Sequence, residues 1–117
     1  MKDLVIAEGV RTPFLKAGSD AKDLSAADLG SQVMKALLER APVKPEEIDE
    51  IIFGCVAQPF DQANVTRVAQ IQAGLPLDIP SYTVHRNCSS SMQLYTTELL
   101  TVTFLRNRSA LSLQKIL

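Results

Sequence analysis

The stretch IIFGCV at residues 51–56 is apolar along its whole length and has no polar alternation. A continuous apolar run of this length is typical of a strand that is covered on both faces, as the strands of a parallel sheet are. Pro59 follows and lacks the backbone N–H that a sheet ladder uses, so we expect the strand to stop there. The stretch therefore predicts a buried strand inside a mainly parallel sheet.

Further strands are predicted on both sides of residues 51–56. Residues 4–7 (LVIA) form another short apolar run and predict the first strand of the chain. Residues 11–22, which include a proline and a glycine, predict a loop. Residues 81–84 (SYTV) combine β-branched and aromatic side chains and predict the third strand.

Two helices are predicted between these strands. Ser25 and the aspartate three residues later have the spacing of a capping box, and leucine and valine then recur every fourth residue. This pattern predicts an amphipathic helix from Ser25 to Arg40. Residues 45–49 (PEEID) suit a single helical turn, because proline opens it and carboxylates follow. Asn64 can cap a second helix, and Gly74 is placed to end it.

The predicted order is therefore strand, helix, strand, helix, strand. Alternation of this kind predicts an α/β layered fold with a mixed, mainly parallel sheet and flanking helices. In such sheets, reactive groups gather just beyond the carboxyl ends of the strands. The residues directly after the third strand are HRNCSSSMQ at positions 85–93, so this rule points to Cys88.

Cys88 is expected in a turn between a strand and a helix. Unpaired N–H groups and the positive end of the helix dipole favour a thiolate at that position, and the thiolate is the nucleophilic form of cysteine. The small side chains of residues 89–91 would let a ligand approach the backbone. Free cysteines are also among the most buried residue types, so an inert Cys88 is the alternative on these grounds alone.

Composition and charge narrow the class of protein. The 117 residues are 46% hydrophobic and 21% charged, with a net charge of -1, which fits a soluble globular domain. Nucleic acids and anionic membranes favour clustered Lys and Arg, so neither is expected as a partner. The four apolar residues 4–7 are too few for a signal peptide or a membrane span, and a cytoplasmic protein is expected. Two cysteines and one histidine indicate neither a disulfide framework nor a metal site.

Four stretches in this order resemble the N-terminal domain of thiolases, the acyl-CoA C-acyltransferases. They are EGVRTPF at 8–14, IIFGCV at 51–56, NVTR at 64–67 and VHRNCSS at 84–90. The resemblance extends over residues 1–93, and it implies the N-terminal part of a thiolase-like layered fold, incomplete in this chain. Residues 94–117 resemble nothing in the family and form a divergent tail.

The resemblance implies a role for Cys88. In thiolases the matching cysteine takes an acyl group from an acyl-CoA as a thioester, and free CoA then collects the acyl chain. Coenzyme A is a substrate there, and no cofactor is permanently bound. The reaction is 3-oxoacyl-CoA cleavage, as in fatty acid β-oxidation, or acetyl-CoA condensation; RTPFLK at residues 11–16 favours the degradative branch. Full-length relatives are expected to be homo-oligomers.

Three other candidate residues are assigned structural roles, and His85 is assigned a structural or surface role. His85 lies three positions before Cys88, so their side chains would face opposite ways along a strand unless the turn at Asn87 re-aims one of them. The catalytic histidine of the family also comes from another domain. Cys55 is expected to be a small buried residue of an apolar strand. Arg11 and Arg67 are each expected to hold a carboxylate or a loop in place.

The sequence departs from the family at two places. Ser91 stands where glycine is common, and its side chain narrows the approach to the nucleophile and disfavours a positive φ. Residues 94–117 contain seven leucines and no Gly, Pro or Asp, and we interpret them as the product of a truncation or frame change. The family's general-base histidine, its Asn-Glu-Ala-Phe segment and its second catalytic cysteine are not found, so the chain alone is expected to be inactive.

Two alternatives stay open at this point. A ketoacyl-synthase-like condensing enzyme would share the fold and the cysteine, although the RTPF and NCSS motifs favour a thiolase. A non-catalytic interaction module would use residues 94–117 as a partner helix. The leucines of that tail are not evenly spaced for one helical stripe, which argues against a dedicated interface.

Overall fold

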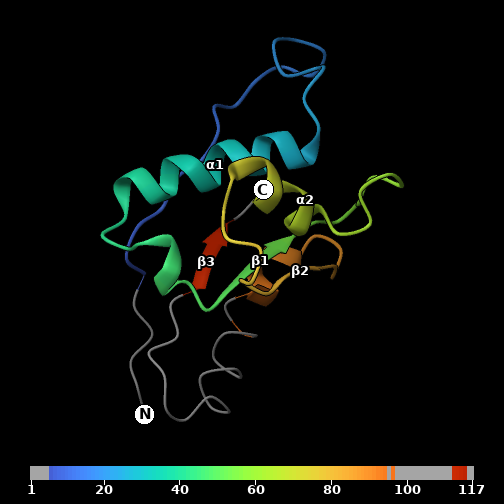
Figure 1. Cartoon of the computed structure of the whole chain (residues 1–117). Helices are drawn as coiled ribbons and strands as arrows, with labels where there is room; N and C mark the ends of the chain where they lie inside the picture. Colours follow the sequence, from blue (N-terminus) through green and yellow to red (C-terminus); the bar gives the residue numbers. More distant parts are fainter. Residues whose placement is uncertain (1–5, 95, 97–111, 116–117) are drawn as a thin grey trace.

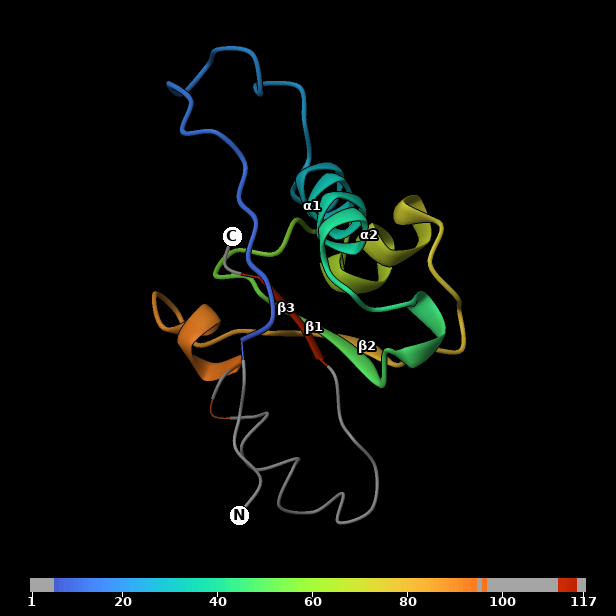
Figure 2. The ribbon, with the colours of Figure 1, turned by 90° about the vertical axis from the view of Figure 1, so that its left-hand side faces the viewer.

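A computed structural model describes residues 6–94, 96 and 112–115 of the chain. The helices are α1 (Ala26–Arg40) and α2 (Val65–Ala73), with the short 3-10 helix η1 (Pro45–Glu47) between them, and the strands are β1 (Glu50–Gly54), β2 (Ser81–Val84) and β3 (Ser112–Lys115). A further helix begins at Ser90. Both α1 and α2 lie on one side of the sheet, and residues 11–24 project beyond α1 as a long loop (Figures 1 and 2).

The described residues form a three-stranded parallel sheet in the order β2-β1-β3. Ile51 lies opposite Ser81 and Gly54 opposite Val84 in the register of β1 and β2. Residues 51–54 are buried, and β1 is the central strand of this sheet. The predicted α/β fold with a mainly parallel sheet is therefore confirmed. The buried strand predicted at residues 51–56 is confirmed for residues 51–54.

The predicted first strand is wrong where the structure describes it. Residues 4 and 5 lie outside the described residues, but Ile6 and Ala7 belong to no strand, and the Ile6 side chain is 73% exposed. The edge of β1 that faces away from β2 pairs instead with β3, a segment that the sequence analysis assigned to no strand. One strand edge accepts one partner, so an apolar run alone does not define which segment pairs there.

The helix boundaries follow the predicted capping residues. Ser25 caps α1: its Oγ accepts a hydrogen bond from the Asp28 N–H at 3.1 Å, and the Asp28 carboxylate accepts one from the Ser25 N–H at 2.8 Å. Asn64 caps α2 by accepting from the Arg67 N–H, and Gly74 ends that helix with a φ of 75°. The single turn predicted at residues 45–49 is η1. These predictions are confirmed.

Strand β1 ends earlier than expected, at Gly54 instead of Val56. The Cys55 N–H still donates to the Val84 carbonyl at 3.0 Å, but β2 ends at Val84 and supplies no further partner. Beyond that point Val56 is 54% exposed. The length of the neighbouring strand therefore limits β1 before Pro59 does.

The hydrophobic core lies between the sheet and the two helices. Its central members are buried apolar side chains from α1, the residue directly after η1, β1, α2 and the loop after α2: Ala27, Met34, Ile48, Ile51, Phe53, Val65, Ala69, Leu75 and Ile79. Ile52 points to the opposite face of β1 by the alternation of a strand and is also fully buried, so both faces of this strand are covered. Among the helices of the described residues, none combines the length and the apolar character of a membrane span.

Candidate functional site

Cys88 lies in a tight turn that joins β2 to the helix beginning at Ser90. Two successive backbone hydrogen bonds enclose it: the Ser89 N–H donates to the Arg86 carbonyl at 3.0 Å, and the Ser90 N–H donates to the Asn87 carbonyl at 3.1 Å. The Cys88 side chain is exposed and its thiol is free. The structure thus confirms the predicted strand-to-helix turn and leaves the thiol accessible from solvent.

The turn contains an unusual backbone conformation at Asn87. Its φ of 48° lies in the left-handed region, and among the described non-glycine residues only Asn87 has a positive φ. Asparagine tolerates this conformation better than most residues. Ser91 follows inside the helix, so the conformation of the described turn does not require glycine at position 91.

The hydroxyl of Ser90 bridges two backbone groups of the same turn. Its Oγ accepts a hydrogen bond from the Arg86 N–H at 2.9 Å and donates one to the Asn87 carbonyl at 2.6 Å. Ser90 is only 4% exposed, although Cys88, two residues earlier, faces solvent. The sequence analysis counted Ser90 only as a small residue. The signal that it missed is a serine placed to hydrogen-bond backbone groups three and four residues before it.

His85 does not join Cys88 in a catalytic pair. His85 is exposed just beyond β2, and no hydrogen bond connects the two side chains in the described part of the chain. The exposed position of His85 is consistent with the structural or surface role that the sequence analysis expects for it.

Cys55 lies at the end of β1 and differs from the prediction in burial. It is half-buried instead of buried, because it falls one residue past the strand. Its thiol is free, so the two cysteines form no disulfide.

Arg67 holds a loop, as the sequence analysis expected, whereas Arg11 is exposed and contacts Thr12 and Phe14 within its own loop. The guanidinium of Arg67 donates to the carbonyls of Leu77 at 2.9 Å and Ile79 at 3.3 Å, which anchors the segment before β2. Arg11 stacks over the Phe14 ring at 4.9 Å from its centroid. These contacts of Arg67 are with backbone carbonyls, and those of Arg11 are with a backbone carbonyl and an aromatic ring. The carboxylate partner that the sequence analysis gave as the alternative is not among these contacts.

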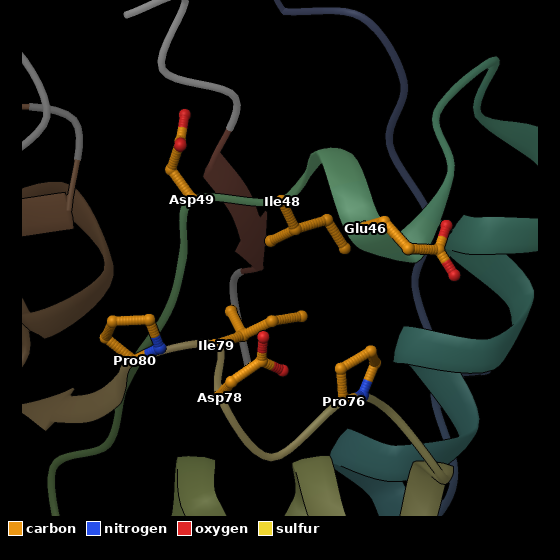
Figure 3. A pocket seen from close by; sticks show the side chains of 7 residues that line it. All are labelled: Glu46, Ile48, Asp49, Pro76, Asp78, Ile79 and Pro80. Carbon is orange, nitrogen blue, oxygen red and sulfur yellow. The ribbon is translucent and has the colours of Figure 1, made fainter.

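A hollow of about 290 Å³ lies at the end of the sheet opposite to the Cys88 turn. Figure 3 shows its lining, which includes the carboxylates of Glu46, Asp49 and Asp78. Asp49 comes directly before β1 and Pro80 directly before β2, so the hollow sits at the amino ends of the strands. It is not part of the Cys88 site. Within the described residues, no group of three or more His, Cys, Asp or Glu side chains is arranged to hold a metal ion.

Comparison with known proteins identifies the family. The family described as "Thiolase, N-terminal domain" matches residues 4–100. The chain belongs to the thiolase family. The resemblance found in the four sequence motifs and the α/β fold that it implied are thereby confirmed.

Relatives of this thiolase-family chain include two ketoacyl-CoA thiolases. A probable 3-ketoacyl-CoA thiolase of Caenorhabditis elegans is 41% identical over 97 residues, which are 83% of this chain and 22% of the relative. A 3-ketoacyl-CoA thiolase of Vibrio vulnificus is 45% identical over 96 residues, which are 80% of this chain and 25% of the relative. The crystal structure of the Bacillus anthracis acetyl-CoA acetyltransferase superimposes with a TM-score of 0.78 at 35% identity, covering 84% of this chain and 25% of that one. The chain therefore spans about a quarter of the length of these relatives.

Proposed function

We propose that Cys88 of this thiolase-family chain accepts an acyl group from an acyl-CoA as a thioester. The observation that carries the proposal is the exposed thiol of Cys88 in the turn between β2 and a helix, within the segment that matches the thiolase family. Cysteine is a strong nucleophile once deprotonated, and an exposed turn leaves room for a large thioester substrate.

The proposed step is a thioester exchange. The Cys88 thiolate attacks the carbonyl carbon of the acyl-CoA, and a bond between Sγ and that carbon forms. The bond from the carbon to the sulfur of CoA then breaks, and the departing CoA thiolate takes up the proton that Cys88 released. Transfer of the acyl group from Cys88 to an acetyl-CoA carbanion would complete the condensation. In the cleavage direction, the thiolate attacks the 3-oxo carbon of a 3-oxoacyl-CoA instead, the bond between C2 and C3 breaks, and acetyl-CoA leaves as an enolate that takes up the proton released by Cys88. Free CoA then takes the acyl group from Cys88. Coenzyme A is a substrate in this scheme, and the scheme needs no permanently bound cofactor.

The direction of the overall reaction is left open by the names of the relatives. They include both 3-ketoacyl-CoA thiolases and acetyl-CoA acetyltransferases. We therefore propose acyl transfer between acyl-CoA and CoA as the function of the whole enzyme type, covering both 3-oxoacyl-CoA cleavage and acetyl-CoA condensation.

We propose further that this chain alone does not complete the catalytic cycle. General bases and oxyanion-stabilising donors supply much of the rate in acyl transfer. The histidine of the chain, His85, is exposed and makes no hydrogen bond to Cys88 among the described residues. Formation of the acyl-cysteine is then the half of the reaction that the chain can support.

Mass spectrometry after incubation with acetyl-CoA or acetoacetyl-CoA tests the proposal. We expect an acetyl group on the peptide that contains Cys88 and none on the peptide that contains Cys55. The Cys88→Ser variant should lose the adduct, and the Cys55→Ser variant should keep it. A folded, soluble chain without an adduct, or with equal labelling of both cysteines, would contradict the role of Cys88.

A further inference from the structure

Gly54, the last residue of β1, lies against the start of the helix that follows Cys88. A Cβ atom built on Gly54 would lie 2.6 Å from the carbonyl carbon of Ser90, 2.6 Å from the nitrogen of Ser91 and 2.9 Å from the carbonyl oxygen of Ser90. All three are backbone atoms, so they cannot rotate away as the end of a side chain could. Glycine at this position therefore lets the carboxyl end of β1 touch the helix start directly.

The Ser90 hydroxyl fixes the other side of the same turn. It bridges the Arg86 N–H and the Asn87 carbonyl, and these two groups flank the left-handed residue directly before Cys88. A buried hydroxyl that satisfies both a donor and an acceptor restricts the backbone between them. The turn is thus held by a hydrogen-bonded bridge at Ser90 and by close packing against Gly54.

We propose that Gly54 and Ser90 are positioning residues, which together set the orientation of Cys88 toward an incoming acyl-CoA. The inference rests on the proposed nucleophilic role of Cys88. Neither residue needs to touch the substrate: Gly54 fixes the distance between β1 and the helix, and Ser90 fixes the backbone at Asn87. Cys88 itself is exposed, whereas Ser90, which makes this contact, is buried.

Two reactions of Cys88 separate positioning from simple accessibility. Acyl transfer from acetyl-CoA needs a defined approach of the thiolate to a carbonyl carbon, whereas alkylation by iodoacetamide tolerates many approaches. A small misplacement of a reacting group costs orders of magnitude in rate, so Ser90→Ala and Gly54→Ala should each slow acylation about tenfold or more. The alkylation rate of Cys88 in the same variants should fall by less than about threefold on the same reasoning.

The chain offers matched controls for both variants. Ser31 is 7% exposed, and its Oγ donates to the Asp28 carbonyl at 2.9 Å, so Ser31→Ala removes a comparable buried bond inside α1. Gly30→Ala introduces a Cβ 2.6 Å from the Phe53 ring and so strains the core at another place. Both controls should leave the ratio of acylation to alkylation at Cys88 unchanged. Circular dichroism and urea denaturation identify any variant that fails to fold. If Gly54→Ala fails to fold, Ser90→Ala alone tests the proposal.

The outcomes distinguish this inference from the proposed function. If the wild-type chain is acylated and Ser90→Ala and Gly54→Ala are acylated as fast, the positioning role is overturned and the proposed function stands. If the wild-type chain is not acylated, the proposed function fails. The effect of Ser90 on the conformation of the turn is then measured by hydrogen exchange and by the pH profile of Cys88 alkylation. Faster exchange of the Arg86 amide in Ser90→Ala with a changed alkylation profile would show that Ser90 holds the Cys88 turn, although orientation toward an acyl-CoA fails together with the proposed function. No change in either measurement overturns the role of Ser90 in the turn as well.

Discussion

Gly30 of α1 lies directly against the ring of Phe53 in β1. A Cβ built on this glycine would come within 2.6 Å of the ring atom Cε2 and within 3.1 Å of the Ala69 Cβ in α2. A glycine inside a helix costs about 1 kcal/mol relative to alanine. Here the close approach of α1 to the sheet offsets that cost, because Phe53 is 2% exposed and burial of a phenylalanine contributes roughly 1.5–3 kcal/mol.

The contact predicts that Gly30→Ala destabilises the chain. Overpacking of a core costs about 1–3 kcal/mol, and the better helix propensity of alanine returns about 1 kcal/mol, so the free energy of unfolding should fall by about 1 kcal/mol. Urea denaturation followed by circular dichroism measures the change. In a Phe53→Leu background the ring is absent, and the same substitution should cost less or become stabilising. A stabilising effect of Gly30→Ala in the wild-type background would contradict the proposed contact.

The capping box of α1 predicts a dependence of stability on pH. Hydrogen bonds from the hydroxyl and the backbone N–H of Ser25 lower the pKa of Asp28 below its usual value. A carboxyl whose pKa is lower in the folded chain stabilises the fold above its unfolded pKa, and this contribution is lost as the pH falls through the folded pKa. Asp28→Asn should therefore be less stable than the wild type at neutral pH, and the difference should shrink in acid.

Thermal denaturation across the acidic range measures this difference. Asp20→Asn is the control, since Asp20 is an exposed carboxylate in the loop before α1 and has no hydrogen bond among the described residues. Its difference from the wild type should be small at every pH. An Asp28→Asn penalty that is the same in acid and at neutral pH would exclude the capping carboxylate as its source.

The parts of the fold that the sequence predicted are those with local causes. The ends of α1 and α2 depend on Ser25, Asn64 and Gly74, whose hydrogen bonds or backbone conformation act within a few residues. The neighbour of β1 depends on which distant segment reaches its edge, and local composition does not contain that information. The apolar run at residues 4–7 was therefore assigned to a strand, although its described residues lie outside the sheet.

The candidate site, like the fold, contains features that the local sequence predicts and features that depend on contacts between distant residues. Cys88 could be predicted because a motif and a strand-to-helix turn are both visible in the sequence. The contact of Gly54 with Ser90 joins residues that are far apart in the sequence, and its only trace is a glycine at the end of an apolar run. The left-handed conformation of Asn87 likewise occurs together with a hydrogen bond from the Ser90 hydroxyl to the Asn87 carbonyl, a contact that the sequence does not show directly.

The buried side chain of Gln70 predicts a third effect on stability. Its side chain is fully buried, and its Nε2 donates to the Pro76 carbonyl at 2.6 Å and to the Ile79 carbonyl at 3.1 Å. Gln70→Leu removes both bonds and a third, which the Gln70 Oε1 accepts from the Arg67 guanidinium at 3.0 Å. Buried acceptors are left with fewer partners, which should cost about 1–3 kcal/mol of unfolding free energy. Hydrogen exchange in residues 75–80 should also become faster, because this loop loses an anchor.

The matched control for this change is Gln58→Leu, at an exposed glutamine in the loop after β1. It removes the same functional group without breaking a buried contact, and its effect on stability should be within about 0.5 kcal/mol. If Gln70→Leu leaves both the denaturation midpoint and the exchange of residues 75–80 unchanged, the loop is held by other contacts, of which those from Arg67 are the next to test.

The two thiols predict a difference in labelling that depends on the fold. Cys88 is exposed in its turn, whereas Cys55 is half-buried and its backbone N–H is bonded to the Val84 carbonyl. Iodoacetamide should therefore label Cys88 several-fold faster than Cys55 in the native chain, and the rates should converge in urea, where exposure no longer differs. Trypsin cleavage after Arg67 and Arg86 places the two thiols on different peptides, so mass spectrometry follows both in one sample. Equal native rates would mean that the end of β1 opens as readily as the turn at Cys88, and the packing of Gly54 against Ser90 would then be too weak to orient the nucleophile.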